Sequence, residues 1–146
     1  MADNKKTHKK ADSKGMLPDG HIQRVESYFR ADHAIFASNR YLGLTTTQRA
    51  LFWDLCAQFN GRNNGDLALN NTFCKEFGWD YGTVKKNRGA LVKSGLVYIA
   101  GEKPLNNYKM MKLYALAFRD LNEDCNEYIT EGAKRKQTIN LKFEGV

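Results

Sequence analysis

The sequence lacks the patterns that mark most enzymes, membrane proteins and secreted proteins. It has no glycine-rich phosphate loop, no nucleophile elbow and no metal-ligand cluster, and its three histidines have no recognisable catalytic spacing. No apolar run approaches the ~20 residues of a membrane span, and the basic N-terminus has no apolar signal core. We therefore expect a cytoplasmic protein that is not an enzyme, with no cofactor, no metal, no membrane contact and no small-molecule ligand.

Cysteine is scarce, and its positions form no framework. Cys56, Cys74 and Cys125 match no zinc-binding spacing, and the first two lie within helical apolar patterns. We expect buried free thiols in a reducing compartment rather than disulfides.

Positive charge is what the chain has in excess. Its 146 residues, enough for one domain, include 23 Lys and Arg against 16 Asp and Glu, a net charge of +7 and a pI near 9.3. Between Asp80 and Lys112 there are seven basic residues and two acidic ones, a local charge of +5. A basic surface of this kind is typical of nucleic-acid binders, although it also suits membranes and acidic proteins.

Two short helices joined by a tight turn are predicted in the middle of the chain. Asn70 and Asp80 are good N-caps, and Gly78 and Gly95 can take the left-handed conformation that ends a helix. The predicted helices cover residues 71–77 and 81–94. In a helix-turn-helix, their buried positions fall on Phe73, Phe77, Trp79 and Val84, with Cys74 at the crossing. Asn87 falls where an apolar residue is expected, and we expect Leu91 to take over that packing.

A lysine-bearing hairpin is predicted directly after the second helix. Residues 96–100 are apolar and rich in β-formers, and residues 108–116 alternate with the period of a strand. Turn-forming residues lie between them, namely Gly101, Pro104, Asn106 and Asn107. The connection presents Lys103 and Lys109.

An upstream helix has the best-marked start. Thr45 and Gln48 form a capping box, and Leu51, Leu55 and Phe59 recur at four-residue intervals on one apolar face. The turn-rich residues 60–66 end this unit, and residues 67–69 are predicted to add a short strand to the hairpin.

These segments resemble a family. The strings TTTQRALFWDL, TVKKNRGALVKSGLVYI and YKMMKLYAL are similar to the winged-helix domains of phage and plasmid DNA-binding proteins, in particular to the N-terminal domains of plasmid replication initiators. The resemblance covers roughly residues 28–118. It implies an α+β fold of the winged helix-turn-helix type, mainly helical with a small antiparallel β-hairpin wing.

The ends of the chain differ from this middle. We predict a disordered basic arm over residues 1–20, a winged-helix domain over 21–118, and a C-terminal helix and tail over 119–146. The arm either lies along phosphates or only solubilises the chain. The acidic residues 120–131 carry Leu121, Cys125 and Tyr128 on one helical stripe, which either closes the domain's own core or makes a homodimer contact. Residues 138–143 are predicted to add a strand.

The predicted function is sequence-specific binding of double-stranded DNA, as a transcriptional regulator of a mobile element or prophage. The first alternative is an origin-binding replication accessory protein, and the second is a winged-helix interaction module that inhibits a host complex. The predicted DNA-binding residues are Tyr81, Gly82, Thr83, Lys85, Lys86, Gly89, Lys103, Asn106, Asn107 and Lys109. Lysines on such a helix can pair with guanine or with phosphate, and the hairpin residues would hold the flanking backbone.

Overall fold

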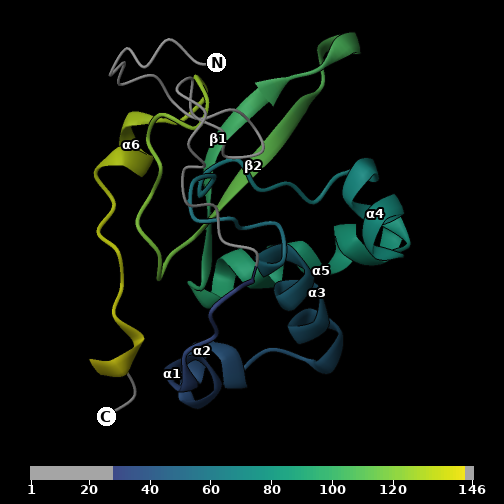
Figure 1. The fold of residues 1–146 in the computed structure, drawn as a ribbon. Coiled ribbons are helices and arrows are strands. Elements are labelled where there is room, and N and C mark those ends of the chain that lie inside the picture. The colour runs from purple at the N-terminus through teal and green to yellow at the C-terminus, as the bar shows by residue number, and fades with distance from the viewer. Residues whose placement is uncertain (1–27, 144–146) are drawn as a thin grey trace, which may run out of the picture.

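The structure, a computed structural model, describes residues 28–143 and is α+β, as the sequence predicts. Figure 1 shows helices α1 to α5 gathered beside a two-stranded antiparallel hairpin that projects beyond them. The elements, in chain order, are α1 (His33–Ala37), α2 (Asn39–Leu42), α3 (Thr46–Cys56), α4 (Asn71–Phe77), α5 (Tyr81–Ser94), β1 (Val97–Pro104), the 3-10 turn η1 (Asn106–Tyr108), β2 (Met110–Leu116), α6 (Glu131–Lys134) and the 3-10 turn η2 (Leu141–Phe143). The predicted arm over residues 1–20 lies outside the described residues.

The capping residues of α4 and α5 act as predicted. The Asn70 side chain accepts from the Phe73 amide at 3.0 Å, and the Asp80 side chain accepts from the Thr83 amide at 3.1 Å. Gly78 and Gly95 end the two helices in the left-handed region, with φ of 76° and 83°. The predicted bounds of both helices are therefore confirmed, because local side-chain-to-backbone bonds fix where each one begins and ends.

Helix α3 packs across α5 and confirms the predicted capping box. The Gln48 amide donates to the Thr45 hydroxyl, and the Thr45 amide donates to the Gln48 side chain. Asn87 on α5 is accommodated by polar contacts, since its Oδ1 accepts from Gln48 Nε2 at 3.3 Å and its Nδ2 donates to the Thr83 carbonyl at 2.8 Å. Leu91 is fully buried, as expected of the residue that takes over the packing.

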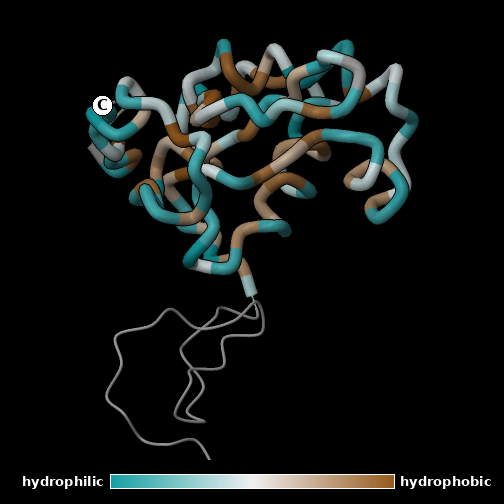
Figure 2. Tube along the Cα trace, turned by 90° about the horizontal axis from the view of Figure 1, so that it is seen from above, coloured by the Kyte–Doolittle hydropathy of each residue, from teal (hydrophilic) through white to brown (hydrophobic). Residues whose placement is uncertain are grey.

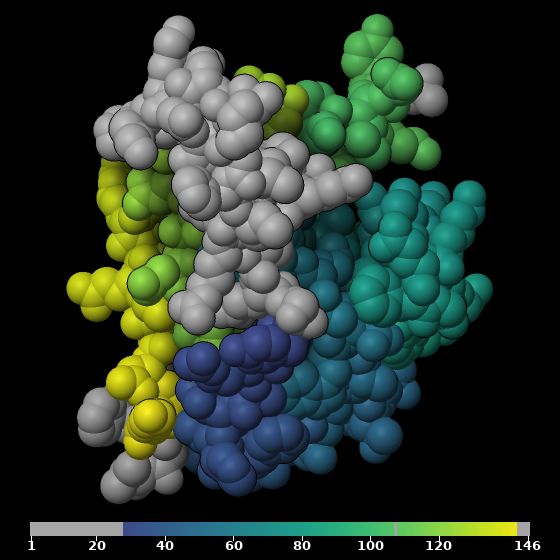
Figure 3. Space-filling model, in the orientation of Figure 1, coloured from purple at the N-terminus to yellow at the C-terminus, as the bar shows by residue number. Residues whose placement is uncertain are grey.

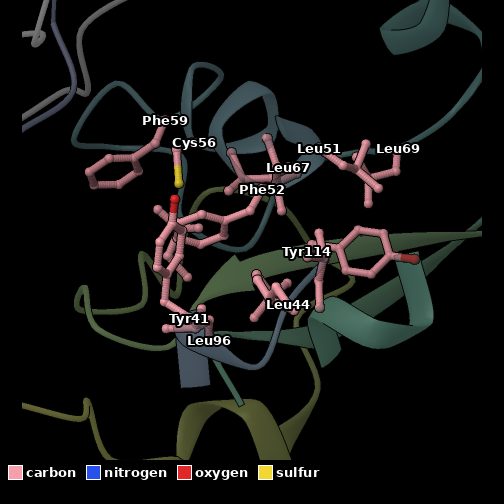
Figure 4. Close-up of a cluster of buried hydrophobic side chains, with 14 of the residues drawn as sticks. Tyr41, Leu44, Leu51, Phe52, Cys56, Phe59, Leu67, Leu69, Leu96 and Tyr114 are labelled. Atoms are coloured by element: carbon pink, nitrogen blue, oxygen red, sulfur yellow. The ribbon is translucent and has the colours of Figure 1, made fainter. Parts of the chain in front are cut away.

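One hydrophobic core joins these helices to the sheet (Figure 4). Buried side chains from α3, such as Phe52 and Leu55, lie in one cluster with Leu91 of α5 and Tyr114 of β2. Figure 2 shows short hydrophobic stretches alternating with hydrophilic ones along the tube, as expected for elements that bury only one face. A hydrogen bond adds to this packing: the indole Nε1 of Trp79 donates to the Asp54 carboxylate at 2.7 Å and links the α4–α5 turn to α3.

The hairpin is longer than the sequence suggested. Strand β1 continues to Pro104, whereas turn residues were expected from Gly101 onwards. A bulge between Ile99 and Gly101 absorbs the irregularity, so the pairing resumes and ends at Pro104 and Met110. The predicted strand over residues 67–69 is present only as an isolated bridge between Leu67 and Tyr114.

The predicted C-terminal helix over residues 120–131 is wrong. Residues 120–130 form an irregular segment with two turns and an isolated bridge from Ile129 to Gly101, and the helix of this region is α6, only four residues long. The backbone bonds elsewhere: the Asn122 amide donates to the Asn64 carbonyl at 2.9 Å, and the Thr130 amide donates to the Ala100 carbonyl at 2.9 Å. Long-range pairing has therefore replaced the local i to i−4 bonds that a helix needs.

The C-terminal segment also packs on the main domain. Ile129 and Ala133 form a second apolar cluster with Ala100 and Ala115, and Leu121 and Cys125 lie against it. The strand predicted over residues 138–143 is wrong, because only the Ile139 amide pairs, with the Ala117 carbonyl at 2.9 Å, before the chain turns into η2. Residues 119–143 thus complete the domain rather than forming a separate unit.

Asn64 is the polar centre of this arrangement. It is fully buried, and its Oδ1 accepts from the Leu116 amide at 2.6 Å. Its Nδ2 lies 3.0–3.1 Å from the carbonyl oxygens of Leu116, Arg119 and Asp120. The backbone amide of Asn64 donates to Asn122 Oδ1, and its carbonyl accepts from the Asn122 amide. One side chain therefore satisfies the backbone where the chain leaves β2 and turns into the C-terminal segment.

We predict that Asn64→Ala destabilises the fold by several kcal/mol. Each buried polar group left without a partner costs about 1–3 kcal/mol, and the Leu116 amide would be one of them. The free energy of unfolding, measured with urea, checks this. Asn71→Ala is the matched control: Asn71 is exposed at the start of α4, and its replacement should change stability by no more than about 0.5 kcal/mol. Equal effects of the two substitutions would contradict the role given to Asn64.

Candidate nucleic-acid interface

Helix α5 buries one face and presents the other. Val84 and Leu91 are fully buried against α3 and the sheet. Of the predicted site residues on this helix, Thr83 is half-buried and the others are exposed, namely Tyr81, Gly82, Lys85, Lys86 and Gly89. The exposed face is therefore basic and free of large aliphatic side chains.

An arginine that the sequence-based site omitted lies beside this face. The Arg88 guanidinium lies 5.8 Å from the centre of the Tyr81 ring, close enough for a cation–π contact. Tyr114 of β2 lies close by, and burial raises the pKa of its hydroxyl. The seven-residue spacing of Tyr81 and Arg88, two turns of helix, was the signal in the sequence that could have placed both on one face.

The hairpin supplies the second part of the surface. Lys103, Asn106 and Lys109 are exposed, as is Lys112, which the sequence-based site also omitted. Asn107 lies within η1, and its side chain is outside the described part of the structure. Figure 1 places the hairpin tip and α4 toward the same side of the molecule, and Figure 3 shows the tip standing clear of the atoms below it.

Helix α4 and the hairpin are tied together at the base. The Leu67 amide donates to the Tyr114 carbonyl at 3.2 Å, and the Tyr114 amide donates to the Leu67 carbonyl at 2.7 Å. Further along, Asn70 Nδ2 lies 3.1 Å from Met111 Sδ. Since Asn70 also caps α4, the start of that helix is held beside β2. These contacts fix the start of α4 relative to the hairpin.

Two glycines lie on the exposed face of α5. A Cβ placed on Gly89 would meet no atom within 4 Å, and one on Gly82 would meet only the Asp80 carboxylate, at 3.0 Å. Glycine in the middle of a helix costs roughly 0.5–1 kcal/mol relative to alanine, so Gly89 weakens α5. The two glycines leave the helix without side chains at one position before and one position after Lys85 and Lys86.

A run of exposed acidic side chains lies in the C-terminal segment. The turn-rich C-terminal segment carries Asp120, Glu123, Asp124, Glu127 and Glu131, all exposed. Figure 1 places α6, where this segment ends, on the far side of the molecule from α4. The same segment continues into the basic residues Lys134, Arg135 and Lys136, and Lys134 pairs with Glu131 at 3.5 Å, so it carries charge of both signs.

The described residues offer little other chemistry. No three His, Cys, Asp or Glu side chains among residues 28–143 gather in a way that could hold a metal. Cys56, Cys74 and Cys125 are free thiols, and burial raises the pKa of Cys56 well above its usual value, which makes that thiol a poor nucleophile. A pocket of about 240 Å³ between Asp32 and Leu141 is smaller than typical small-molecule sites.

Comparison with known proteins assigns no family to this surface. The chain matches no family model, no curated protein and no solved structure. None of the helices in residues 28–143 has the length and apolar character needed to cross a bilayer.

We predict that Gly89→Ala stabilises the protein by about 0.5–1 kcal/mol, because alanine favours the helix and its methyl group meets no atom. Gly78→Ala is the matched control. Gly78 ends α4 at a φ of 76°, so the same substitution should destabilise by about 1 kcal/mol or more. Thermal or urea unfolding measures both. A destabilising Gly89→Ala would show that this position is packed and not open.

Proposed function

We propose that this protein is a sequence-specific double-stranded DNA-binding protein with a winged helix-turn-helix architecture, acting as a transcriptional regulator of a mobile element or prophage. Helix α4, the turn at Gly78 and helix α5 form the helix-turn-helix, α5 is the recognition helix, and the hairpin is the wing. The observation that carries the proposal is the exposed face of α5, which is basic and has glycine at two positions.

The dimensions suit the major groove. An α-helix with its side chains is about 10–12 Å across and the groove is about 12 Å wide. With 14 residues, α5 is about 21 Å long, which allows its N-terminal half to enter the groove while its C-terminal half packs on the domain. Lys85 and Lys86 are exposed in the N-terminal half, where they can bond to guanine or to phosphate.

The remaining groups have distinct roles. Gly82 and Gly89 let the helix backbone approach the DNA, and Tyr81, oriented beside Arg88, bonds or stacks at the groove edge. The wing residues Lys103 and Lys109 contact the phosphate backbone, and Asn106 is exposed beside them. Phosphate contacts set the position of the protein, and the contacts of α5 to base edges supply the sequence specificity.

A role at a replication origin uses the same surface. The observation that separates the two functions is where the sites lie: repeated sites at an origin indicate replication, and a promoter operator indicates transcriptional regulation. A homodimer stays a prediction. Leu121 and Cys125, two of the three side chains expected to form its contact, already pack within the chain.

We predict that replacing Lys85 and Lys86 together with alanine abolishes a mobility shift at moderate salt and leaves the circular dichroism spectrum unchanged. Binding by the wild type should fall steeply with salt, and each lost phosphate contact should lower the slope of log affinity against log salt by about 1. The probe is a duplex selected by the wild type from a random-sequence pool.

The matched control is the double replacement of Lys134 and Lys142 with alanine. Both lysines are exposed in the C-terminal segment, so this variant loses the same charge away from the proposed interface. It should retain nearly all binding. Equal losses in the two variants would mean that only net charge matters, and would contradict the assignment of α5.

A further inference from the structure

The tip of the hairpin carries apolar side chains that the fold does not use. Leu105, Tyr108 and Met110 expose 45%, 104% and 53% of their surface. None of the three belongs to either apolar cluster. Large exposed apolar groups gathered at the end of a projecting hairpin indicate a contact with another molecule.

The tip is held in a defined shape. The Leu105 amide donates to the Lys109 carbonyl at 2.7 Å and closes the loop. Tyr108 has a φ of 62°, the one positive value at a non-glycine position among the described residues. An aromatic residue is rare in this conformation, and backbone strain of this kind clusters at functional sites. The loop thus holds the Tyr108 ring out in solvent at the tip of the wing.

Positive charge surrounds the apolar tip. Lys103 and Lys109 flank it, and Lys112 lies behind it on β2, paired across the strands with Glu102. Apolar groups bordered by lysines match a duplex groove, in which stacked bases lie between two phosphate backbones. Apolar side chains that enter the minor groove can insert between base steps and kink DNA by about 20–90°.

We propose that the wing tip is an intercalating wedge: Tyr108, supported by Leu105, inserts between base pairs in the minor groove of the DNA held by α5, and kinks it. This inference rests on the proposed function. In this proposal, the apolar tip contacts the bases and the wing lysines contact the phosphates. Specificity would then include the ease with which a base step unstacks, so flexible pyrimidine–purine steps would be favoured beneath the tip.

The test measures bending directly. The probe is the selected duplex with a donor and an acceptor dye at its two ends, and energy transfer reports their separation. Wild-type protein should shorten the separation. Tyr108→Gly combined with Leu105→Ala should bind about tenfold more weakly, within the range that aromatic–base stacking contributes, and should leave the DNA straight. Glycine adopts a positive φ without strain, so this variant keeps the loop.

Two control variants test whether the aromatic ring of Tyr108 causes the bend. Tyr108→Phe retains the aromatic wedge and should bend the DNA like the wild type. Tyr28→Ala removes a tyrosine that is 61% exposed outside the hairpin, and should change neither affinity nor bending. Equal bending by the tip variant and the wild type, or wild-type binding without any bend, would overturn the wedge and leave DNA binding intact.

Further outcomes distinguish failure of the wedge from failure of the proposed DNA-binding function. Failure of the wild type to bind any selected duplex would defeat the proposed function itself, and the wedge with it. Sedimentation with vesicles of phosphatidylglycerol and phosphatidylcholine tests the other surface that an apolar tip among lysines could meet. Vesicle binding that is lost in the tip variant, with straight DNA in the wild-type complex, would assign the tip to a membrane surface and overturn the wedge.

Discussion

The buried amide of Asn64 is the interaction on which the rest of this structure depends. It bonds to the backbone at the end of β2 and at the start of the C-terminal segment. Both partners lie more than 50 residues after Asn64 in the sequence, so the bonds join distant parts of the chain. The adjacent Gly65 reinforces this constraint. A Cβ there would lie 2.7 Å from Ile129 Cδ1 and 2.9 Å from Leu121 Cδ1, and its φ of 117° also favours glycine. The C-terminal segment packs here. As a result, Ile129 and Ala133 cover the face of the hairpin that carries Ala100 and Ala115.

The buried face of α5 contributes to stability, whereas its exposed face and the hairpin tip contain features that reduce stability. The buried face of α5 has its apolar residues fully packed, and its polar exception, Asn87, is bonded to Gln48 and to the Thr83 carbonyl. The exposed face has Gly89, which weakens the helix, and the hairpin tip holds an aromatic residue at positive φ. Local features that reduce stability without a packing reason are expected where a protein meets another molecule. In this chain, they occur beside the exposed lysines of α5 and the hairpin.

The distribution of charge has a structural basis as well. The acidic segment is folded against the sheet through Leu121, Cys125 and Ile129, and its carboxylates remain exposed. Exposed carboxylates therefore border the covered face of the hairpin, and Lys136 of the same segment lies over the Tyr98 ring of β1. The lysines on the exposed face of α5 and at the hairpin tip would attract an anionic polymer, as the proposed encounter with DNA requires.

The sequence by itself determined the elements whose signals are local. The caps Asn70 and Asp80 and the glycines that end α4 and α5 act within a few residues of their own positions, so the bounds of both helices, and with them the exposed face of α5, could be predicted. The tertiary structure alone decided the course of residues 120–130. Their helical stripe was overridden because Asn122 pairs with Asn64 and because Gly65 and Gly101 leave room for close approach; a Cβ on Gly101 would collide with the Tyr128 carbonyl. It also decided the length of the hairpin, through the bulge before Gly101, and the exposure of Tyr108 at its tip. These outcomes depend on bonds and contacts between residues far apart in the chain, which a local pattern does not contain.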